Sequence, residues 1–155
     1  MALVVEDSTG KPDANSYVSV AEADSYHGDR GNANWSAATT KEAALINATS
    51  YVDSLYRFQG LRASDTQALE WPRAGVTGIP KRLKDAVCEL ALRALSGPLA
   101  ADVAPEQVIE TTVGPITKKY AAAPLNGGRK RYPLVDGMLR PLLVVTSGNV
   151  PLLRV

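Results

Sequence analysis

The fold is decided by residues 80–98, which read PKRLKDAVCELALRALSGP. Apolar residues recur in this stretch at steps of three and four, as they do on the faces of a helix. They form one stripe of Leu83, Val87, Leu90 and Ala94 and a second stripe of Cys88, Leu92 and Leu95. Pro80 is tolerated in a first helical turn, and Gly97-Pro98 stops the helix. A helix that is apolar on two sides is sandwiched, either at the centre of a helical bundle or beneath a neighbouring subunit.

A short helix is predicted to start at Ser19. Ser19 and Glu22 have the spacing of a capping box, in which each side chain satisfies a free backbone N–H group of the other residue. Gly28 or Gly31 then offers a stop.

A longer helix is predicted between Thr39 and Gly60. Thr39 and Glu42 repeat the capping-box spacing, and Gly60 ends the pattern. The apolar residues in between recur at steps of four and three, and this stripe is expected to face the core. It consists of Ala44, Ala48, Tyr51, Leu55 and Phe58.

Residues 108–120 change to a β pattern, with Gly114-Pro115 as a tight turn between two runs rich in β-branched residues. Because a lone hairpin is marginal in water, it is expected to pair with the apolar run at residues 2–6 or with a hairpin of a neighbouring subunit. The predicted fold class is mainly α (α+β). It is a small bundle of three to four helices with a β-hairpin and an extended C-terminal tail, assembling as a ring.

The C-terminal part is predicted to be less regular. Residues 1–120 form the helical domain with its hairpin, and residues 121–155 form a basic loop followed by a docking tail at 147–155. Between them, Asp136 to Val145 is either a short helix or an extended run, since Pro141 opposes a long helix.

Charge is distributed unevenly along the chain. Residues 1–110 hold 10 Lys and Arg against 15 Asp and Glu, whereas residues 111–155 hold 7 cations against the single acid Asp136. The two parts therefore carry net charges of −5 and +6, which sum to the overall +1. Such asymmetry indicates contact with nucleic acid or with an acidic protein surface, including a neighbouring copy.

Several classes of protein are excluded by composition. No run of residues is apolar enough to span a bilayer, and the acidic start at Glu6-Asp7 does not suit a signal peptide, so we expect a protein that stays in the cytoplasm of the cell that makes it, with no membrane partner. The single Cys88 and the single His27 provide neither a disulfide nor a Cys/His zinc site. No cofactor, metal site or catalytic residue is predicted. Cys88 is expected in the core, and His27 is expected to be an exposed structural residue.

The residues expected to face nucleic acid are cationic. A cluster next to Gly127-Gly128 and Tyr132 suits phosphates, because glycines let cations follow a backbone and an aromatic ring can stack on a base. The alternative is a solvated loop or a loop bound to an acidic partner. The proposed residues are Lys118, Lys119, Arg129, Lys130 and Arg131.

Two further segments are candidates for protein contact. Trp71 and Arg73, in Trp-Pro-Arg between two helices, either form a subunit interface or close the helical core. The C-terminal end is unusually apolar for an exposed tail and is predicted to dock on a partner. This docking tail comprises Val150, Pro151, Leu152, Leu153, Arg154 and Val155.

A family resemblance is carried by several motifs. They are EDSTG at residues 6–10, ANSYVS at 14–19, Tyr26 with Arg30-Gly31, Ala48-Thr49 with Tyr51, QALEWPR at 67–73, CELA at 88–91 and VGP at 113–115. Across about residues 3–120 the chain resembles the tailed-phage family described as DnaT-like single-stranded-DNA-binding proteins. Tyr17 and Trp71-Pro72-Arg73 are its most telling residues. The resemblance supplies no catalytic residues.

Two functions follow from this resemblance. Such proteins are similar in size and element order to head-to-tail connectors, which implies a structural adaptor of the virion. In that interpretation, a ring of about twelve copies joins the portal protein to a stopper or tail terminator protein, with genomic DNA passing through its lumen. The alternative is a single-stranded-DNA-binding protein of phage replication. The adaptor is the interpretation favoured by the sequence, and an enzyme is disfavoured.

Overall fold

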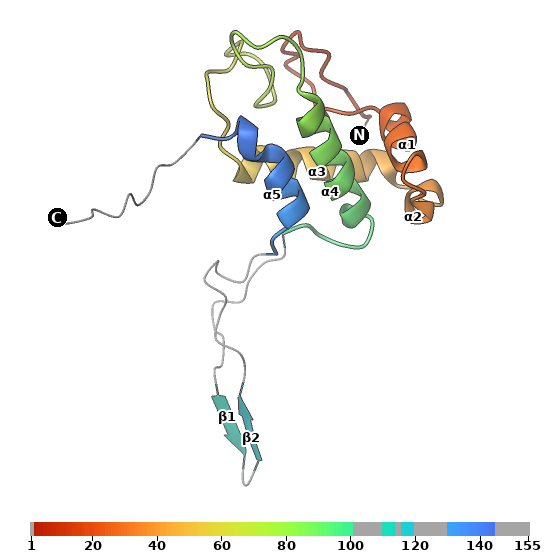
Figure 1. The fold of residues 1–155 in the computed structure, drawn as a ribbon, viewed down its shortest axis with the longest axis vertical. Coiled ribbons are helices and arrows are strands. Elements are labelled where there is room, and N and C mark those ends of the chain that lie inside the picture. The colour runs from red at the N-terminus through yellow and green to blue at the C-terminus, as the bar shows by residue number, and fades with distance from the viewer. Residues whose placement is uncertain (1, 101–109, 114–115, 120–129, 145–155) are drawn as a thin grey trace, which may run out of the picture.

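The computed structural model describes residues 2–100, 110–113, 116–119 and 130–144 of the chain (Figure 1). The helices are α1 (Val20–Gly28), α2 (Ala33–Ser36), α3 (Lys41–Leu55), α4 (Lys81–Ala94) and α5 (Pro133–Leu139), followed by the 3-10 turn η1 (Arg140–Leu142). Strands β1 (Glu110–Val113) and β2 (Ile116–Lys119) form one antiparallel hairpin. The prediction of a mainly helical fold with a hairpin is confirmed. Assembly as a ring stays a prediction.

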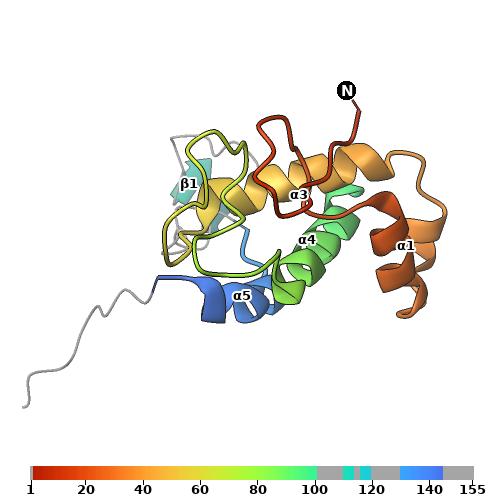
Figure 2. The same ribbon diagram turned by 90° about the horizontal axis from the view of Figure 1, so that it is seen from above.

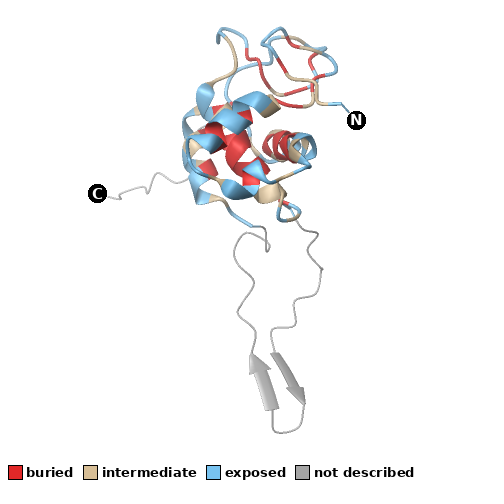
Figure 3. Ribbon diagram, turned by 90° about the vertical axis from the view of Figure 1, so that its right-hand side faces the viewer, coloured by how far each residue is buried: buried red, intermediate tan, exposed pale blue. Residues whose placement is uncertain are grey.

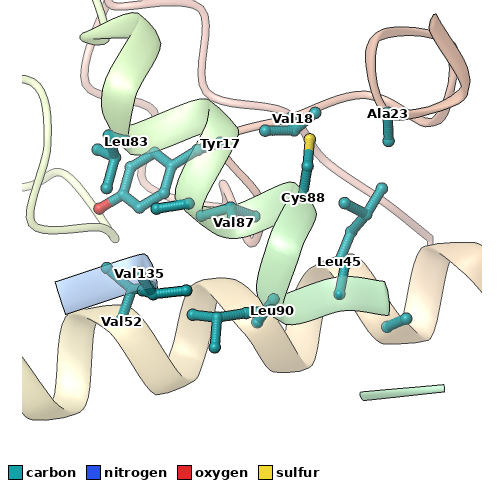
Figure 4. Packing of buried hydrophobic residues seen from close by; sticks show 14 of the residues in the cluster. Tyr17, Val18, Ala23, Leu45, Val52, Leu83, Val87, Cys88, Leu90 and Val135 are labelled. Carbon is teal, nitrogen blue, oxygen red and sulfur yellow. The ribbon is translucent and has the colours of Figure 1, made fainter. Parts of the chain in front are cut away.

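Helix α4 lies at the centre of the bundle, in contact with α1, α3 and α5 (Figures 1 and 2). Its fully buried residues include Leu83, Val87 and Leu90, and Figure 4 shows Leu90 beside Val52 of α3 and Val135 of α5. The first predicted stripe is therefore covered within one chain up to Leu90, whereas Leu92 and Leu95 of the second stripe are only partly buried. Figure 3 shows the buried residues gathered on the inner faces of these helices.

The start of α1 matches the prediction. The Ser19 side chain accepts the Glu22 backbone N–H, and the Glu22 carboxylate accepts the Ser19 N–H at 2.9 Å, which together make the predicted capping box. The helix ends at Gly28.

The predicted ends of α3 are wrong. Its N-cap is Thr40 rather than Thr39, because the first helical hydrogen bond runs from the Ala44 N–H to the Thr40 carbonyl. The Thr40 side chain makes no cap hydrogen bond, so the predicted capping box is absent. Helix α3 ends at Leu55 instead of Gly60 because Phe58 pairs in an extended bridge with Leu143. The core face is also shifted: Leu55 is 41% exposed, and the buried positions are Ala44, Leu45, Ala48, Thr49 and Val52.

The run at residues 2–6 does not form the predicted strand. Within it, Val5 makes one isolated parallel bridge, to Ser16, and in the described part of the chain each strand of the hairpin has the other as its partner in the sheet. The carboxylate of Glu6 is buried and accepts the backbone N–H groups of Gly10 at 2.9 Å and Lys11 at 2.8 Å. Residues 2–11 therefore form a closed loop in which a buried charge is satisfied by backbone donors.

The region left open between helix and strand is a short helix. Helix α5 is continued by η1, which contains Pro141, and it buries Val135 and Leu139 against α4. The docking tail at 147–155 lies outside the described residues.

His27 is fully buried, so the expectation of exposure is wrong. Its Nδ1 is 3.0 Å from the Asn32 amide nitrogen, which can only donate, so Nε2 carries the proton and donates to the Cys88 carbonyl at 3.1 Å. The ring also packs against Tyr26 and Trp35. His27 thus ties α1 to α4 as a neutral structural residue. Cys88 is buried as predicted, and burial raises the pKa of its thiol to about 12.

Candidate nucleic-acid interface

A cleft of about 540 Å³ opens where α5 and η1 meet the chain that leaves α3. Its lining combines two arginines, one acid and one tyrosine with small and apolar residues. The lining residues are Tyr56, Arg131, Pro133, Asp136, Gly137, Arg140 and Leu143. We refer to this site as the α5 cleft.

Asp136 is the central polar group of the α5 cleft. The Tyr56 hydroxyl donates to its Oδ1 at 2.7 Å, and Arg131 Nη2 lies 3.3 Å from its Oδ2. Burial, followed by the hydrogen bond to Asp136, raises the pKa of Tyr56 above its ordinary value, so its hydroxyl stays a neutral donor.

Local pairing holds these groups in place. The Gln59 N–H donates to the Leu142 carbonyl at 3.0 Å, and the Val144 N–H donates to the Arg57 carbonyl at 2.9 Å. These bonds clamp the segment after α3 to η1, and so fix Tyr56 next to α5. Pro133 begins α5 in the first-turn position that suits proline.

The cations of the α5 cleft are open to solvent. The Arg131 side chain is 67% exposed, compared with 31% for Asp136, and Arg140 is also exposed. A Cβ atom added at Gly137 would meet no atom within 4 Å apart from its chain neighbours and the backbone of its own helix, so no other part of the chain covers the helix there. Exposed guanidinium groups beside bare backbone can contact phosphate groups of a flexible strand.

The structure brings together only part of the predicted cationic set. Lys130 and Arg131 are both exposed, and Arg131 lines the α5 cleft, while Arg129 lies outside the described residues. Lys118 and Lys119 belong to β2, in register with Thr111 and Glu110, and Figure 1 draws the hairpin away from the helical body.

Tyr56 and Arg140 were not identified from sequence. Arg140 lies in the stretch whose structure the sequence left open, and the Tyr56–Asp136 hydrogen bond joins residues 80 positions apart. The one available signal was that Arg140 belongs to the basic C-terminal third.

Tyr132 packs against the body of the bundle. Its hydroxyl donates to the Leu99 carbonyl at 3.0 Å, and its ring meets Tyr51 edge-on at a centroid distance of 5.7 Å. The ring expected to stack on bases thus anchors the start of α5.

Trp71 and Arg73 belong to the core, which supports the core-closing alternative. Trp71 is 3% exposed and packs edge-on against Phe58. The Arg73 guanidinium donates to the Gly60 carbonyl at 2.8 Å and pairs with Glu70. These contacts join distant parts of the long segment between α3 and α4 and so stabilise its conformation.

Tyr17 connects this segment to the bundle. Its hydroxyl donates to both carboxylate oxygens of Asp53, at 2.7 and 2.9 Å, and accepts the Trp71 N–H at 3.1 Å. The Glu70 N–H also donates to Asp53, at 3.0 Å. The most telling residues of the resemblance therefore maintain the fold. We call this set, Tyr17, Asp53, Glu70, Trp71 and Arg73, the buried network.

Other classes of site were sought in the described ranges. No three His, Cys, Asp or Glu side chains there are placed to hold a metal ion, and no helix there has the length and hydropathy to cross a bilayer. The absence of enzymatic activity stays a prediction.

Comparison with known proteins gives one family. The family model described as "Putative DnaT-like ssDNA binding protein" matches residues 1–155, whereas no curated protein and no solved structure matches. This match overturns the connector interpretation, because the description names DNA binding rather than head-to-tail joining. The predicted ring, protein partners and virion location are not tested by it. The chain belongs to the DnaT-like single-stranded-DNA-binding family.

Proposed function

We propose that this chain binds single-stranded DNA and that the α5 cleft is the surface that contacts its phosphates. The observation that carries the proposal is the pair of exposed arginines, Arg131 and Arg140, on either side of bare helix backbone at Gly137. Family membership over the whole chain independently supports the binding of single-stranded DNA.

The charge distribution supports this location. Residues 130–144 contain Lys130, Arg131 and Arg140 against Asp136, a net charge of +2, whereas residues 1–110 carry −5. A polyanion is attracted to the basic side of such a molecule and repelled by the rest.

The mode of binding follows from the groups available. The Tyr132 ring is packed against Tyr51, and the hydrogen bond to Asp136 holds Tyr56 in one orientation, so neither ring can turn toward a base. Phosphate contacts therefore dominate, which makes binding independent of base sequence and strongly dependent on salt. Three cations correspond to a slope of about −2 in a plot of log K against log salt, at about −0.7 per phosphate on a single strand.

The test is fluorescence anisotropy of a labelled oligothymidine over a series of salt concentrations. Arg131→Ala combined with Arg140→Ala should weaken binding at least about tenfold and flatten the slope by about 1.4, because two phosphate contacts are lost.

Lys41→Ala is the control for the loss of a single cation outside the α5 cleft, compared with the arginine variant per cation removed. Lys41 is the first residue of the 15-residue α3, so it lies about 22 Å along that helix from the end that leads to Tyr56. The DNA affinity of the Lys41→Ala variant and the slope of its log K against log salt should remain close to those of the wild type. Equal losses in the control and in the arginine variant would show that overall charge, not the α5 cleft, determines binding.

A further inference from the structure

Asp136 occupies an unexpected position for a protein that binds a polyanion. It is the single acid among residues 111–155, which hold seven cations, and it lies in the lining of the α5 cleft. Its charge reduces the attraction of the cleft for phosphate, so a structural or functional reason for it is required.

Both carboxylate oxygens of Asp136 are engaged. Oδ1 accepts the Tyr56 hydroxyl at 2.7 Å, and Oδ2 accepts Arg131 at 3.3 Å. The two non-bridging oxygens of a phosphodiester accept hydrogen bonds from the same kinds of donor, hydroxyl and guanidinium groups. The carboxylate therefore presents the same charge and a similar pair of oxygens as the proposed ligand.

The two contacts differ in strength. The Tyr56 bond is short and half-buried, whereas the Arg131 contact is long for a charge-assisted bond and involves a side chain that is 67% exposed. An exposed ion pair of this length is weak and is screened by salt. Arg131 can therefore leave Asp136 while Asp136 keeps its bond to Tyr56.

We propose that Asp136 is an internal anion that holds Arg131 in the DNA-free protein and competes with DNA phosphate for it. This inference rests on the proposed function of the α5 cleft. Tyr56 positions the carboxylate, and Arg131 exchanges one anion for the other when a strand binds. Each binding event then loses the Arg131–Asp136 ion pair, which lowers the affinity below what the cations alone would give.

The opposite role is that Asp136 orients Arg131 toward a phosphate, as carboxylates do for many ligating groups. The two roles predict opposite signs when the charge of Asp136 is removed. If Asp136 competes with phosphate, removing its charge strengthens DNA binding. If Asp136 orients Arg131 toward phosphate, removing its charge weakens DNA binding.

The test is Asp136→Asn in the oligothymidine assay. The amide keeps an oxygen for Tyr56 and removes the charge. We expect affinity to rise at least about threefold, because Arg131 no longer has to leave an internal anion before it contacts phosphate, and we expect the salt slope to change little, because the number of phosphate contacts stays the same. The thermal unfolding midpoint of the variant, measured alongside, identifies any loss of folded protein.

Asp7→Asn is the matched control. Asp7 also accepts a hydroxyl, from Thr9 at 2.6 Å, and a cation, Lys11 at 2.9 Å, but it lies in the N-terminal loop and does not line the α5 cleft. Asp7→Asn changes the net charge by the same amount as Asp136→Asn but leaves the α5 cleft unchanged. The affinity of Asp7→Asn for oligothymidine should therefore change by less than half as much.

A double variant tests whether the effect acts through Arg131. In an Arg131→Ala background, Asp136→Asn should give a clearly smaller gain, since no guanidinium remains to be released. An undiminished gain, or a loss of affinity in Asp136→Asn alone, overturns the competitor role while wild-type binding upholds the proposed function. Absence of oligothymidine binding by the wild type overturns both.

Discussion

Two tyrosine–aspartate pairs, Tyr17–Asp53 in the buried network and Tyr56–Asp136 in the α5 cleft, share the same 2.7 Å hydrogen bond and differ in their surroundings. Asp53 receives its further donor from the Glu70 backbone, whereas Asp136 receives its further donor from an exposed arginine. A backbone donor is fixed by the fold. A solvated guanidinium can exchange its partner.

This difference assigns the two regions to different tasks. The buried network joins α3, the segment before α4 and the N-terminal loop through groups that have no access to a ligand. The α5 cleft has the same type of polar pair but leaves a cation within reach of solvent. A tyrosine–aspartate pair is therefore structural or functional according to its third partner.

The largest expected effect comes from the buried network. Trp71→Ala should lower the free energy of unfolding by about 3–5 kcal/mol, because it leaves a large cavity against Phe58. Urea denaturation followed by circular dichroism measures the change. Leu134→Ala, on the surface of α5 at 52% exposure, is the control and should cost about 0.5 kcal/mol or less. Similar losses in both variants would refute the structural role of Trp71.

The two tyrosines offer a closer comparison. Tyr17→Phe should lower the free energy of unfolding by about 1–3 kcal/mol, because it removes one of the two donors to half-buried Asp53 and leaves the buried Trp71 N–H without its acceptor. Tyr56→Phe removes one bond to a partly exposed acid and should cost about 1 kcal/mol or less. The same denaturation experiment applies to both, and a reversed order would contradict the assignment.

The free energy of unfolding is expected to depend on pH through the carboxyl group of Asp53. Burial raises the pKa of Asp53 to about 6, although its bonds to the Glu70 N–H and Tyr17 lower it in part. The unfolded value is about 4, so the folded protein binds this proton more tightly. The stabilising contribution of Asp53 is therefore complete below about pH 4 and is lost as pH rises through about 6.

Asp53→Asn should remove this dependence. The wild-type free energy of unfolding, minus that of the variant, should fall between about pH 4 and pH 6.5 in a series of urea denaturations. Burial lowers the pKa of His27, which acts in the opposite direction, but His27 is common to both proteins and cancels in the difference. A difference that is flat or rises with pH would contradict the assignment.

The smallest effect is expected from the hairpin. Lys118→Ala combined with Lys119→Ala removes two cations, as the α5-cleft variant does, but these residues belong to β2 rather than to α5 or η1. Oligothymidine affinity should fall by less than about threefold, which reflects long-range charge alone. A loss equal to that of the arginine pair would place the main DNA contact on the hairpin.

Sequence patterns predicted local features more reliably than distant ones. The helix at residues 81–94 is evident from its apolar periodicity, and the Ser19–Glu22 capping box involves neighbours in the chain. The end of α3 was missed because the pairing of Phe58 with Leu143 is a tertiary interaction.

The candidate site was predicted in part for the same reason. Lys130 and Arg131 were identified by their charge, but no local pattern marks Tyr56 as the partner of Asp136. For Trp71 and Arg73 the sequence left two alternatives open, a subunit interface or closure of the core. Their burial supports closure of the core.

The most direct test is NMR mapping of oligothymidine on the isotope-labelled protein. The account predicts that backbone amide shifts concentrate at residues 130–143 and at Tyr56, and that they decrease as salt rises. Shifts concentrated at α1 and α2, or no shifts at any strand concentration, would contradict the assignment of the α5 cleft as the DNA-binding surface.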